Sequence, residues 1–374
     1  MKIAILGTKG IPNNYGGFEQ FAENISVLLV KSGHQVTVYN PHFHSYSEQI
    51  FNGVQIKKIF SPEKQIGASA NFIYDFLCLK DALNDNYDVI LECGYHSNAP
   101  SYYLMGNKKK PILITNMDGL EWKRSKWGKI TKWLIKRLEL LAIKKSHYLI
   151  SDNVGIQQYY KKEYGVDSFY IAYGADLVSE YNVSYLEEYA LKPQEYLLLI
   201  ARLEPENNIE LILDSYIMSG SKFPFLVIGN CTTKYGRFLQ KKYTSTRIRF
   251  IGSIYNMPQL DSLRKYALGY FHGHSVGGTN PSLLEAMASQ AFIIAHDNKF
   301  NKSVLQHNAL YFSNVEELSS VINRLSVYSS DERNKMIRGN CDLIRTNYSW
   351  TYIAKEYEKV FIESLKRIES KSDR

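Results

Sequence analysis

The segment from His272 to Ala288 holds the groups of this chain that are best suited to binding an anion. An apolar run leads into a glycine-rich turn, and Pro281 then opens a helical pattern with a single acidic residue, Glu285. Asn280 is a suitable N-cap, and proline suits the first helical position. A strand, a glycine turn and a helix start direct free N–H groups and the helix dipole at one place. We therefore expect a diphosphate on the turn and a ribose hydroxyl on Glu285; the alternative is an ordinary strand-to-helix turn with a surface glutamate.

The loop Gly7–Glu19 is a second candidate anion site, between the first predicted strand and the helix that follows it. Gly16 and Gly17 stand at the helix entrance, where the lack of side chains lets a bulky anion approach the backbone. The loop has neither the G-x-G-x-x-G spacing of dinucleotide-binding folds nor the Gly-Lys-Ser/Thr of a P-loop. Because open parallel sheets bind ligands at the carboxyl ends of their strands, a functional loop is favoured over a long turn.

Arg202 follows the first predicted strand in the second half of the chain. A guanidinium at the carboxyl end of a strand matches a diphosphate better than an ammonium does, because it donates two parallel hydrogen bonds. The alternatives are a structural salt bridge from Arg202 and a simple helix cap. The nearby residues that would serve them are Glu204, Glu206, Asn207 and Asn208.

A polar cluster follows the predicted strand Ile112–Thr115. Asp118 could orient an acceptor hydroxyl or receive its proton, and Trp122 could stack on the face of a sugar. Glu121 and Arg124 add hydrogen-bonding groups of both charges. The alternative is turn chemistry, because Asp-Gly is a common turn dipeptide, but four useful side chains in so short a stretch favour a site.

Length and composition indicate a globular protein of two domains. The chain has 374 residues, of which 45% are hydrophobic and 22% charged, and that length is too great for one ordinary core. Its four cysteines lack C-x-x-C spacing, which argues against a zinc site or a disulfide framework and favours a reducing compartment. No apolar run has the length of a membrane span, and the first residues resemble a strand rather than a signal peptide. We therefore expect the protein to stay inside the cell that makes it.

The net charge of +8 is concentrated in one segment. Residues 108–147 hold twelve Lys or Arg against three Asp or Glu, a local net charge of +9. Between the lysines, tryptophans and aliphatic residues recur at helical spacing over Trp127–Lys145, which is typical of helices that bind anionic membranes. We expect the apolar stripe to be mostly core and its basic rim to touch lipid headgroups. The alternatives are a solvated core helix and nucleic-acid binding, but no recognition module supports the latter.

Strands and helices alternate along both halves of the chain, which predicts parallel sheets with helices on both faces. The first series begins at Lys2–Leu6, a polar and tyrosine-rich stretch interrupts it, and a second series begins at Tyr196–Ile200. A final helical pattern over Tyr352–Glu369 needs a partner surface. The expected organisation is a first domain at 1–175, a linker at 176–193, a second domain at 194–348 and a C-terminal helical segment at 349–374.

Taken together, these motifs resemble retaining glycosyltransferases of family four, and within them the bacterial rhamnosyltransferase-like subgroup of cell-wall and capsule polysaccharide synthesis. The resemblance covers nearly the whole chain and implies the GT-B fold, in which two doubly wound Rossmann-like domains face each other across a cleft. The N-terminal domain would then be the acceptor side, the C-terminal domain would bind the nucleotide-sugar, and the last helix would return to the first domain. The motifs that carry it are Gly10–Glu19, Met117–Trp127, Ala201–Asn208, His272–Ala288 and Tyr348–Trp350.

The resemblance also implies a role for each matching residue. Asp118 would be the catalytic residue, as the acid of the family's His-Asp pair. The residues that would bind the donor diphosphate or nucleotide are Gly16, Gly17, Arg202, Asn207, Gly278, Thr279, Asn280 and Glu285. The residues that would contact the sugar or the acceptor are Glu121, Trp122, Arg124 and His274.

Three positions depart from the family pattern. Gly277 stands where the family has a glutamate, so another residue, such as His274, would have to contact the donor sugar. Asn207 replaces a lysine, which leaves Arg202 to neutralise the diphosphate nearly alone. Met117 replaces a histidine, which would suit a deoxy sugar.

The implied function is sugar transfer with retention at the cytoplasmic face of the cell membrane. L-Rhamnose from dTDP-rhamnose is the favoured donor, and a lipid-diphosphate-linked sugar is the expected acceptor. No acidic pair has metal-ligand spacing, so we expect neither a metal nor another cofactor. Two other classes stay open, a sugar-nucleotide epimerase or hydrolase of the same fold and a non-catalytic sugar-nucleotide-binding protein. A dehydrogenase is disfavoured because the dinucleotide fingerprint is missing.

Overall fold

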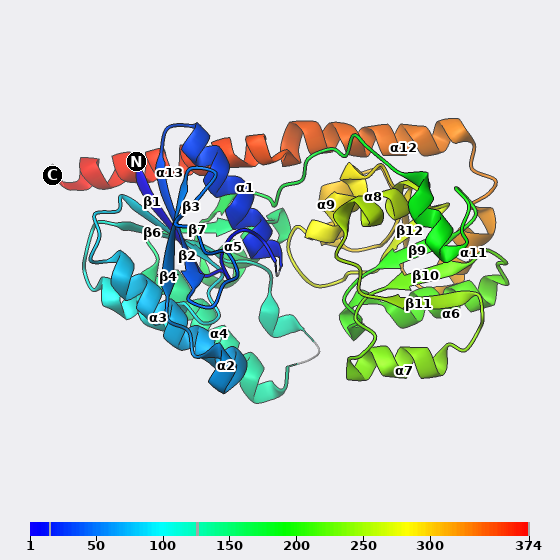
Figure 1. Cartoon of the computed structure of the whole chain (residues 1–374), viewed down its shortest axis with the longest axis horizontal. Coiled ribbons are helices and arrows are strands. Elements are labelled where there is room, and N and C mark those ends of the chain that lie inside the picture. Colours follow the sequence, from blue (N-terminus) through cyan, green and yellow to red (C-terminus); the bar gives the residue numbers. More distant parts are fainter. Residues whose placement is uncertain (15, 125–126, 373–374) are drawn as a thin grey trace. The chain divides into compact units, whose positions relative to one another are not determined.

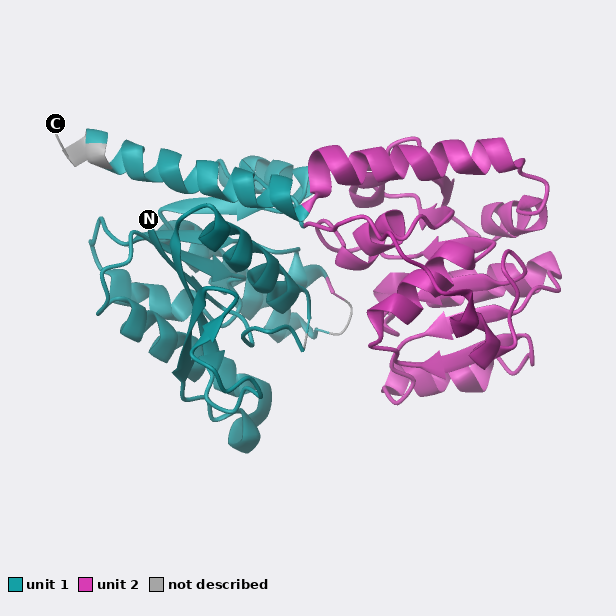
Figure 2. Ribbon diagram, turned by 45° about the horizontal axis from the view of Figure 1, so that its top comes forward, with its two compact units in different colours: residues 1–123, 127–173, 350–374 teal, residues 124–126, 174–349 magenta. Residues whose placement is uncertain are grey.

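The computed structural model describes residues 1–14, 16–124 and 127–372 and forms two compact α/β units (Figures 1 and 2). The first unit comprises residues 1–123, 127–173 and 350–374, and the second comprises residues 124–126 and 174–349. None of the described helices combines the length and apolar character that crossing a membrane requires.

The first unit is built on a sheet with the strand order β3-β4-β2-β1-β5-β6-β7-β8. Neighbouring strands run parallel except for β3 and β4. The central strands β1, β5 and β6 are almost wholly buried, as expected of a parallel sheet covered on both faces. The strands are β1 (Lys2–Leu6), β2 (Gln35–Pro41), β3 (Ile50–Phe51), β4 (Val54–Ile59), β5 (Val89–Cys93), β6 (Ile112–Asn116), β7 (Tyr148–Ser151) and β8 (Phe169–Tyr170).

Helices cover the sheet of the first unit on both faces (Figure 1). The C-terminal helix α13 packs on α1, where the Phe21 ring lies 5.0 Å from Tyr357 and 6.4 Å from Trp350. The Tyr357 hydroxyl also accepts a hydrogen bond from Asn116 Nδ2 at 2.9 Å, at the end of β6. The helices are α1 (Gly17–Lys31), α2 (Glu63–Ile66), α3 (Ala70–Ala82), α4 (Lys129–Lys145), α5 (Val154–Tyr164) and α13 (Trp350–Ser372), with 3-10 turns η1 (Gly67–Ser69), η2 (Ala99–Met105) and η3 (Glu121–Lys123).

The second unit has a wholly parallel sheet in the order β11-β10-β9-β12-β13-β14. Numbered within this unit, the order is 3-2-1-4-5-6, which is the arrangement of nucleotide-binding Rossmann folds. The strands are β9 (Leu197–Ile200), β10 (Phe225–Ile228), β11 (Ile248–Gly252), β12 (Gly269–His272), β13 (Ile293–His296) and β14 (Leu310–Phe312).

The core of the second unit is formed by apolar side chains from the strands and from the helices around them. Phe225 and Phe271, on β10 and β12, have ring centroids 5.1 Å apart and are buried with Leu197 and Ile294. The helices are α6 (Ile209–Ser219), α7 (Lys234–Lys242), α8 (Met257–Tyr266), α9 (Pro281–Ala288), α10 (Lys299–Leu305), α11 (Val315–Arg324) and α12 (Ser330–Leu343), with the shorter turns η4 (Val183–Tyr189), η5 (Pro205–Asn207) and η6 (Ile344–Tyr348).

The predicted fold class, two Rossmann-like domains with parallel sheets, is confirmed. The alternation of apolar strands with amphipathic helices was sufficient for this prediction, because parallel neighbours need a long crossover connection, which is usually a helix. The stretch 176–193, expected as a linker, contains η4 and packs on the second unit. Val178 N donates to Ala288 O at 3.1 Å, and Arg249 Nη1 donates to Tyr189 O at 2.6 Å.

Candidate functional site

The candidate site of the second unit lies at the point where its strand order reverses. β9 and β12 are neighbours in the sheet, yet the chain leaves them in opposite directions toward α6 and α9. Loops diverge at such a point and leave a crevice beyond the carboxyl ends of the strands, where these sheets bind ligands. Arg202 follows β9, and the glycine turn with Gly278, Thr279 and Asn280 follows β12, so the fold brings both predicted groups to this crevice.

The two loops that form this crevice are hydrogen-bonded to each other. Asn208 Nδ2 donates to Gly273 O at 2.7 Å, and the Ser275 N–H and hydroxyl both donate to Glu206 O, at 3.1 and 2.8 Å. The approach is so close that a Cβ on Gly273 would lie 2.1 Å from Asn207 O, which only glycine permits. The crevice is therefore rigid at its base.

Arg202 is exposed and forms no ion pair with any residue of the described ranges, so the salt bridge considered from the sequence is not formed. Asn207 is different, because it is buried and its Nδ2 donates to Arg202 O at 2.8 Å. This bond fixes the loop that carries the guanidinium. Asn207 thus supports Arg202 through the backbone, while its predicted contact with the donor stays a prediction.

The start of α9 has the predicted geometry. Asn280 is the N-cap, and its Oδ1 accepts a hydrogen bond from Ser282 N at 2.9 Å, which confirms the cap expected from the sequence. Thr279 is buried just before it, and Gly277 has a φ of 139°, a value that L side chains rarely adopt. A glycine turn that leads into a capped helix start can present backbone N–H groups to an anion.

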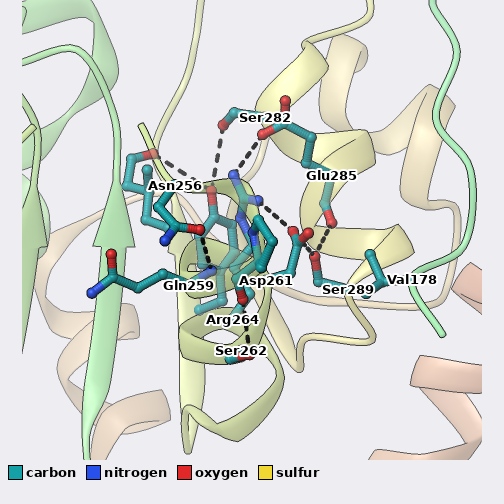
Figure 3. Close-up of polar contacts among 12 residues, drawn as sticks. Val178, Asn256, Gln259, Asp261, Ser262, Arg264, Ser282, Glu285 and Ser289 are labelled. Carbon is teal, nitrogen blue, oxygen red and sulfur yellow. Dashed lines mark hydrogen bonds and ion pairs between the residues drawn. The ribbon is translucent and has the colours of Figure 1, made fainter. Parts of the chain in front are cut away.

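Glu285 lies one turn inside α9 with its side chain 20% exposed. Its Oε2 accepts a hydrogen bond from Arg264 Nη2 at 2.6 Å (Figure 3). Arg264 comes from α8, is 1% exposed and was not identified from the sequence. The available signal was a charged residue four positions after Leu260 on the apolar face of α8, where another aliphatic residue was expected.

His274 lies in the turn after β12 and stacks on His272, with ring centroids 4.4 Å apart at 15°. The residue is partly exposed, but its Nδ1 is buried and forms no hydrogen bond with the described residues. Burial, reinforced by the positive charge of Arg202, lowers the pKa of His274 to about 3. The imidazole is therefore neutral near pH 7 and can both donate and accept a hydrogen bond.

The loop of the first unit that contains Gly16 and Gly17 leads into α1 as expected, with Gly16 as N-cap and Tyr15 outside the described residues. A feature not foreseen is Glu19, which is buried in the first turn and accepts a hydrogen bond from Lys9 N at 2.6 Å. Burial raises the pKa of Glu19, and the backbone hydrogen bonds of this loop oppose that shift. The chain's own carboxylate thus accepts a hydrogen bond from the backbone of this loop at Lys9, and the roles of Gly16 and Gly17 stay predictions.

The polar cluster after β6 is positioned by the strand end. Asp118 has a φ of 51°, and its N–H donates to Asn116 Oδ1 at 3.0 Å. A non-glycine residue in this left-handed region carries a conformational cost that is often found at functional sites. Asp118 is partly exposed.

The other members of that cluster are tied to neighbouring aromatic and basic side chains. Glu121 Oε1 accepts a hydrogen bond from Trp127 Nε1 at 3.0 Å. The Trp122 ring lies under the Lys136 ammonium, 4.5 Å from its centroid, so a sugar stacked on that face would have to displace Lys136. Arg124 groups with the second unit, and residues 125 and 126 of the same motif lie outside the described ranges.

The helix over Trp127–Lys145 differs from its prediction. Leu138 and Ala142 are buried, but Ile130 is 84%, Trp133 59% and Leu134 47% exposed. The expectation that its apolar stripe is mostly core is therefore wrong for the first two turns of α4. The reason is that the unit covers only the narrow face on which Leu138 and Ala142 lie.

A buried carboxylate on the inner face of α4, Glu139, fixes the orientation of the helix. The sequence analysis did not identify it. Glu139 is fully buried and accepts hydrogen bonds from the hydroxyls of Tyr159 at 2.9 Å and Tyr164 at 2.5 Å. Tyr95 approaches the other oxygen at 3.4 Å. With Glu139 held inward, Trp133 and Leu134 must face outward.

No cluster of His, Cys, Asp and Glu suited to a metal ion occurs in the described ranges. The expectation that no metal or cofactor is needed stays a prediction.

Two family models match the chain. Residues 186–340 match the glycosyl transferases group 1, and residues 1–176 match a domain of unknown function, DUF1972. No curated protein is similar enough in sequence to count as a match.

Solved structures share the fold along nearly the whole chain. Sucrose-phosphate synthase from Thermosynechococcus elongatus superposes with a TM-score of 0.76 at 13% identity, over 97% of this chain and 98% of its own. HepE from Anabaena, in complex with UDP and glucose, has a TM-score of 0.74 at 15% identity, over 97% and 100%. Trehalose 6-phosphate synthase from Burkholderia multivorans has a TM-score of 0.69 at 10% identity, over 100% and 99%.

The solved structures show that the chain has the GT-B fold found in glycosyltransferases, and residues 186–340 match the model of glycosyl transferases group 1.

Proposed function

We propose that this protein is a retaining glycosyltransferase that moves L-rhamnose from dTDP-rhamnose to a lipid-diphosphate-linked sugar, in the synthesis of a bacterial surface polysaccharide. The observation that carries the donor half of this proposal is the crevice of the second unit. There, Arg202, the start of α9 and Glu285 gather at the strand-order reversal of a 3-2-1-4-5-6 sheet. The choice of rhamnose rests on the sequence motifs alone.

The donor site is proposed to work by charge stabilisation. Arg202 has no ion-pair partner among the described residues and is exposed, so its guanidinium is available to a diphosphate. The start of α9 adds N–H groups and a helix dipole, and both act where negative charge grows as the bond to the sugar breaks. The structural relatives support a donor of this class, because HepE has been crystallised with UDP and with UDP-glucose.

The chemical step is proposed to use no protein nucleophile. The bond from the anomeric carbon to the diphosphate oxygen breaks, the acceptor oxygen forms its bond to the same face of that carbon, and the acceptor proton goes to the leaving phosphate. Asp118 would orient the acceptor or the sugar in this step. His274, neutral because burial lowers its pKa to about 3, would hydrogen-bond the donor sugar where the family's glutamate is replaced by Gly277.

A lipid-linked acceptor requires the enzyme to reach a membrane surface, and α4 fits that task. Its exposed apolar residues Ile130, Trp133 and Leu134 stand among Lys129 and Arg137, whose guanidinium carbon lies 5.2 Å from the Trp133 ring centroid. Basic helices with exposed tryptophan bind anionic bilayers in two ways: the apolar side chains enter the interface, and the basic side chains are attracted to the lipid headgroups. We propose that the first unit binds the inner face of the cell membrane through α4.

The test is donor turnover with purified protein and no added metal. The donors are dTDP-rhamnose, UDP-sugars and GDP-sugars, each with and without a lipid-diphosphate N-acetylglucosamine acceptor, while nucleoside diphosphate release is followed. Acceptor-dependent release from dTDP-rhamnose, with a product of retained anomeric configuration by NMR, is expected. Release or isomerisation without acceptor would identify an epimerase or hydrolase instead. Donor binding without any turnover would identify a sugar-nucleotide-binding protein.

A further inference from the structure

Arg264 is buried between two carboxylates beneath the candidate nucleotide site (Figure 3). Its Nη1 lies 3.0 Å from Asp261 Oδ1 and its Nη2 lies 2.6 Å from Glu285 Oε2. The Ser289 hydroxyl lies 2.7 Å from both Asp261 Oδ1 and the Glu285 carbonyl oxygen, which joins the far end of α9 to the same cluster. The guanidinium therefore binds one group on its own helix, α8, and one on α9.

This cluster leaves Glu285 little freedom. Arg264 is 1% exposed, so its side chain has no solvent-filled space in which to rotate. The hydrogen bond from Arg264 to Glu285 is short, at 2.6 Å, and joins two charged groups, so it belongs to the strong class of hydrogen bonds. Breaking it would leave the buried positive charge of Arg264 with Asp261 as its remaining charged partner. Glu285 Oε2 is therefore committed to the protein.

The second carboxylate oxygen of Glu285 is available to a ligand. Oε1 accepts no hydrogen bond from the described residues, and the Glu285 side chain keeps 20% of its surface exposed. In Figure 3, Oε1 points away from Arg264 and from the cluster below it. One carboxylate oxygen, Oε2, thus bonds the protein, and the other, Oε1, is left for the ligand.

This division determines how a ribose can be recognised. The 2′- and 3′-hydroxyls of a ribose are neighbours, so the two oxygens of a free carboxylate can each face one of them, as they face the two N–H groups of a bidentate arginine. With Oε2 bonded to Arg264, Oε1 alone faces the ligand, and we expect it to form one well-aligned hydrogen bond, to the 3′-hydroxyl. A 2′-deoxyribose has only the 3′-hydroxyl, so it should form the same hydrogen bond to Glu285 as a ribose and bind with the same affinity.

We propose that Arg264 is a specificity-determining positioning residue, which restricts Glu285 to one ribose hydroxyl and so makes the site indifferent to the 2′-hydroxyl of the nucleotide. The inference rests on the proposed function, because it takes Glu285 as the ribose-binding carboxylate. It deepens that function by assigning a sugar class to the nucleotide itself: 2′-deoxyribonucleoside diphosphates bind as well as their ribonucleotide counterparts.

The test compares ligands that differ by one hydroxyl. Thymidine diphosphate, ribothymidine diphosphate and 3′-deoxythymidine diphosphate are titrated into the full chain by calorimetry, and the same three sugars are compared in the uridine series. The 2′-hydroxyl should change Kd by less than about twofold, whereas loss of the 3′-hydroxyl should weaken binding about tenfold or more. Ribonucleotides binding about tenfold more tightly than their 2′-deoxy counterparts would overturn the proposal.

Variants of Arg264 test whether this residue positions Glu285 or only stabilises the fold. Arg264→Met keeps the length of the side chain and frees Oε2, so it should create a preference of about tenfold for the ribonucleotides. Arg249→Met is the matched control, because Arg249 is an arginine of the same unit whose side chain, within the described ranges, donates to Tyr189 O and not to Glu285. Loss of affinity for all ligands with an unchanged ribo-to-deoxy ratio would show a structural role only and contradict the proposal.

If Arg264→Met does not fold, the wild-type titrations still decide the proposal, and Glu285→Gln tests whether Glu285 is the group that binds the 3′-hydroxyl. It should abolish the dependence on the 3′-hydroxyl and leave any diphosphate affinity from Arg202. Failure of the inference and failure of the proposed function are distinguishable. Binding that depends on the 2′-hydroxyl refutes the inference alone, whereas no binding by any nucleoside diphosphate refutes both.

Discussion

Replacing Ile130, Trp133 and Leu134 by glutamine should release the protein from anionic membranes. The three side chains are 84%, 59% and 47% exposed on the first two turns of α4, so their removal costs the folded state little packing. Glutamine is a good helix former, and it keeps the helix while removing the apolar surface.

The expected magnitude follows from the exposed fractions. Removing a whole Ile or Leu side chain from water is worth ~2 kcal/mol, which gives ~1.7 kcal/mol for Ile130 and ~1 kcal/mol for Leu134. Trp133 exposes about 120 Å² if a tryptophan offers ~200 Å², which is worth ~3 kcal/mol at ~25 cal/mol per Å². If the interface covers about half of this surface, the triple variant loses ~3 kcal/mol, or ~100-fold in partitioning.

The assay is sedimentation with vesicles of phosphatidylglycerol, compared with vesicles of phosphatidylcholine alone. The matched control replaces Ile217, Met218 and Tyr255 by glutamine, because these residues of the second unit are 54%, 57% and 88% exposed. Binding of the wild type should also weaken as salt rises, since basic side chains contribute part of it. A triple α4 variant that sediments like the wild type, or a control that is released equally, would refute the membrane role of α4.

Four further predictions concern the sites themselves. Arg202→Ala should weaken nucleoside diphosphate binding by calorimetry ~10- to 100-fold, the loss expected for one charged hydrogen bond. Asp118→Asn, which keeps the left-handed backbone that Asn also tolerates, should lower kcat ~100-fold and leave diphosphate affinity unchanged. Gly273→Ala should lower the free energy of unfolding by ~2 kcal/mol or more, because its Cβ would lie 2.1 Å from Asn207 O. His272→Phe should reduce the loss of stability in acid, measured by urea unfolding at several pH values.

The sign of the last prediction follows from burial. His272 is 1% exposed, and burial holds its pKa well below the ordinary value, so the folded state does not bind a proton that the unfolded chain binds below pH ~6.5. Stability therefore falls as the pH decreases through and below that value, by at most ~1.4 kcal/mol per pH unit for this group. An unchanged slope in His272→Phe would show that the ring is protonated in the folded protein.

Controls decide the other three predictions. Arg202→Lys should restore part of the affinity lost in Arg202→Ala, and an unaltered Kd in the alanine variant would remove Arg202 from the site. A fall in diphosphate affinity in Asp118→Asn would argue for a structural role of Asp118. A Gly273→Ala variant with the melting temperature of the wild type would show that the two loops of the crevice can separate at little cost.

The fold was predictable from the sequence because its signals are local. Alternating strand and helix patterns, the Asn280 cap and the glycine turn depend on residues within a few positions of one another. That the loop of Arg202 lies beside the loop after β12 could also be predicted, because each loop follows a strand and parallel strands end at the same edge of a sheet.

The features that could not be predicted depend on contacts between segments that are distant in the sequence. The stripe from Trp127 to Ala142 was visible, but its division into a core face and an exposed face depends on the width of the surface that α4 covers. In the same way, Glu19 near the start of α1 was visible as an acidic residue favourable to the helix dipole. Only the folded loop shows that its carboxylate accepts a hydrogen bond from Lys9 N, ten positions earlier in the chain.

Arg264 is the strongest case, because its effect is on chemistry rather than on fold. The segment that contains Glu285 predicts a carboxylate at the proposed nucleotide site, but a carboxylate has two oxygens, and its neighbours decide how many of them face the ligand. That neighbour comes from α8 and is separated from Glu285 by 21 residues. A chain with the same glycine turn and an aliphatic residue in place of Arg264 would present both oxygens and should discriminate ribose from 2′-deoxyribose. On this proposal, the nucleotide preference of such a site is set by a residue that does not touch the nucleotide.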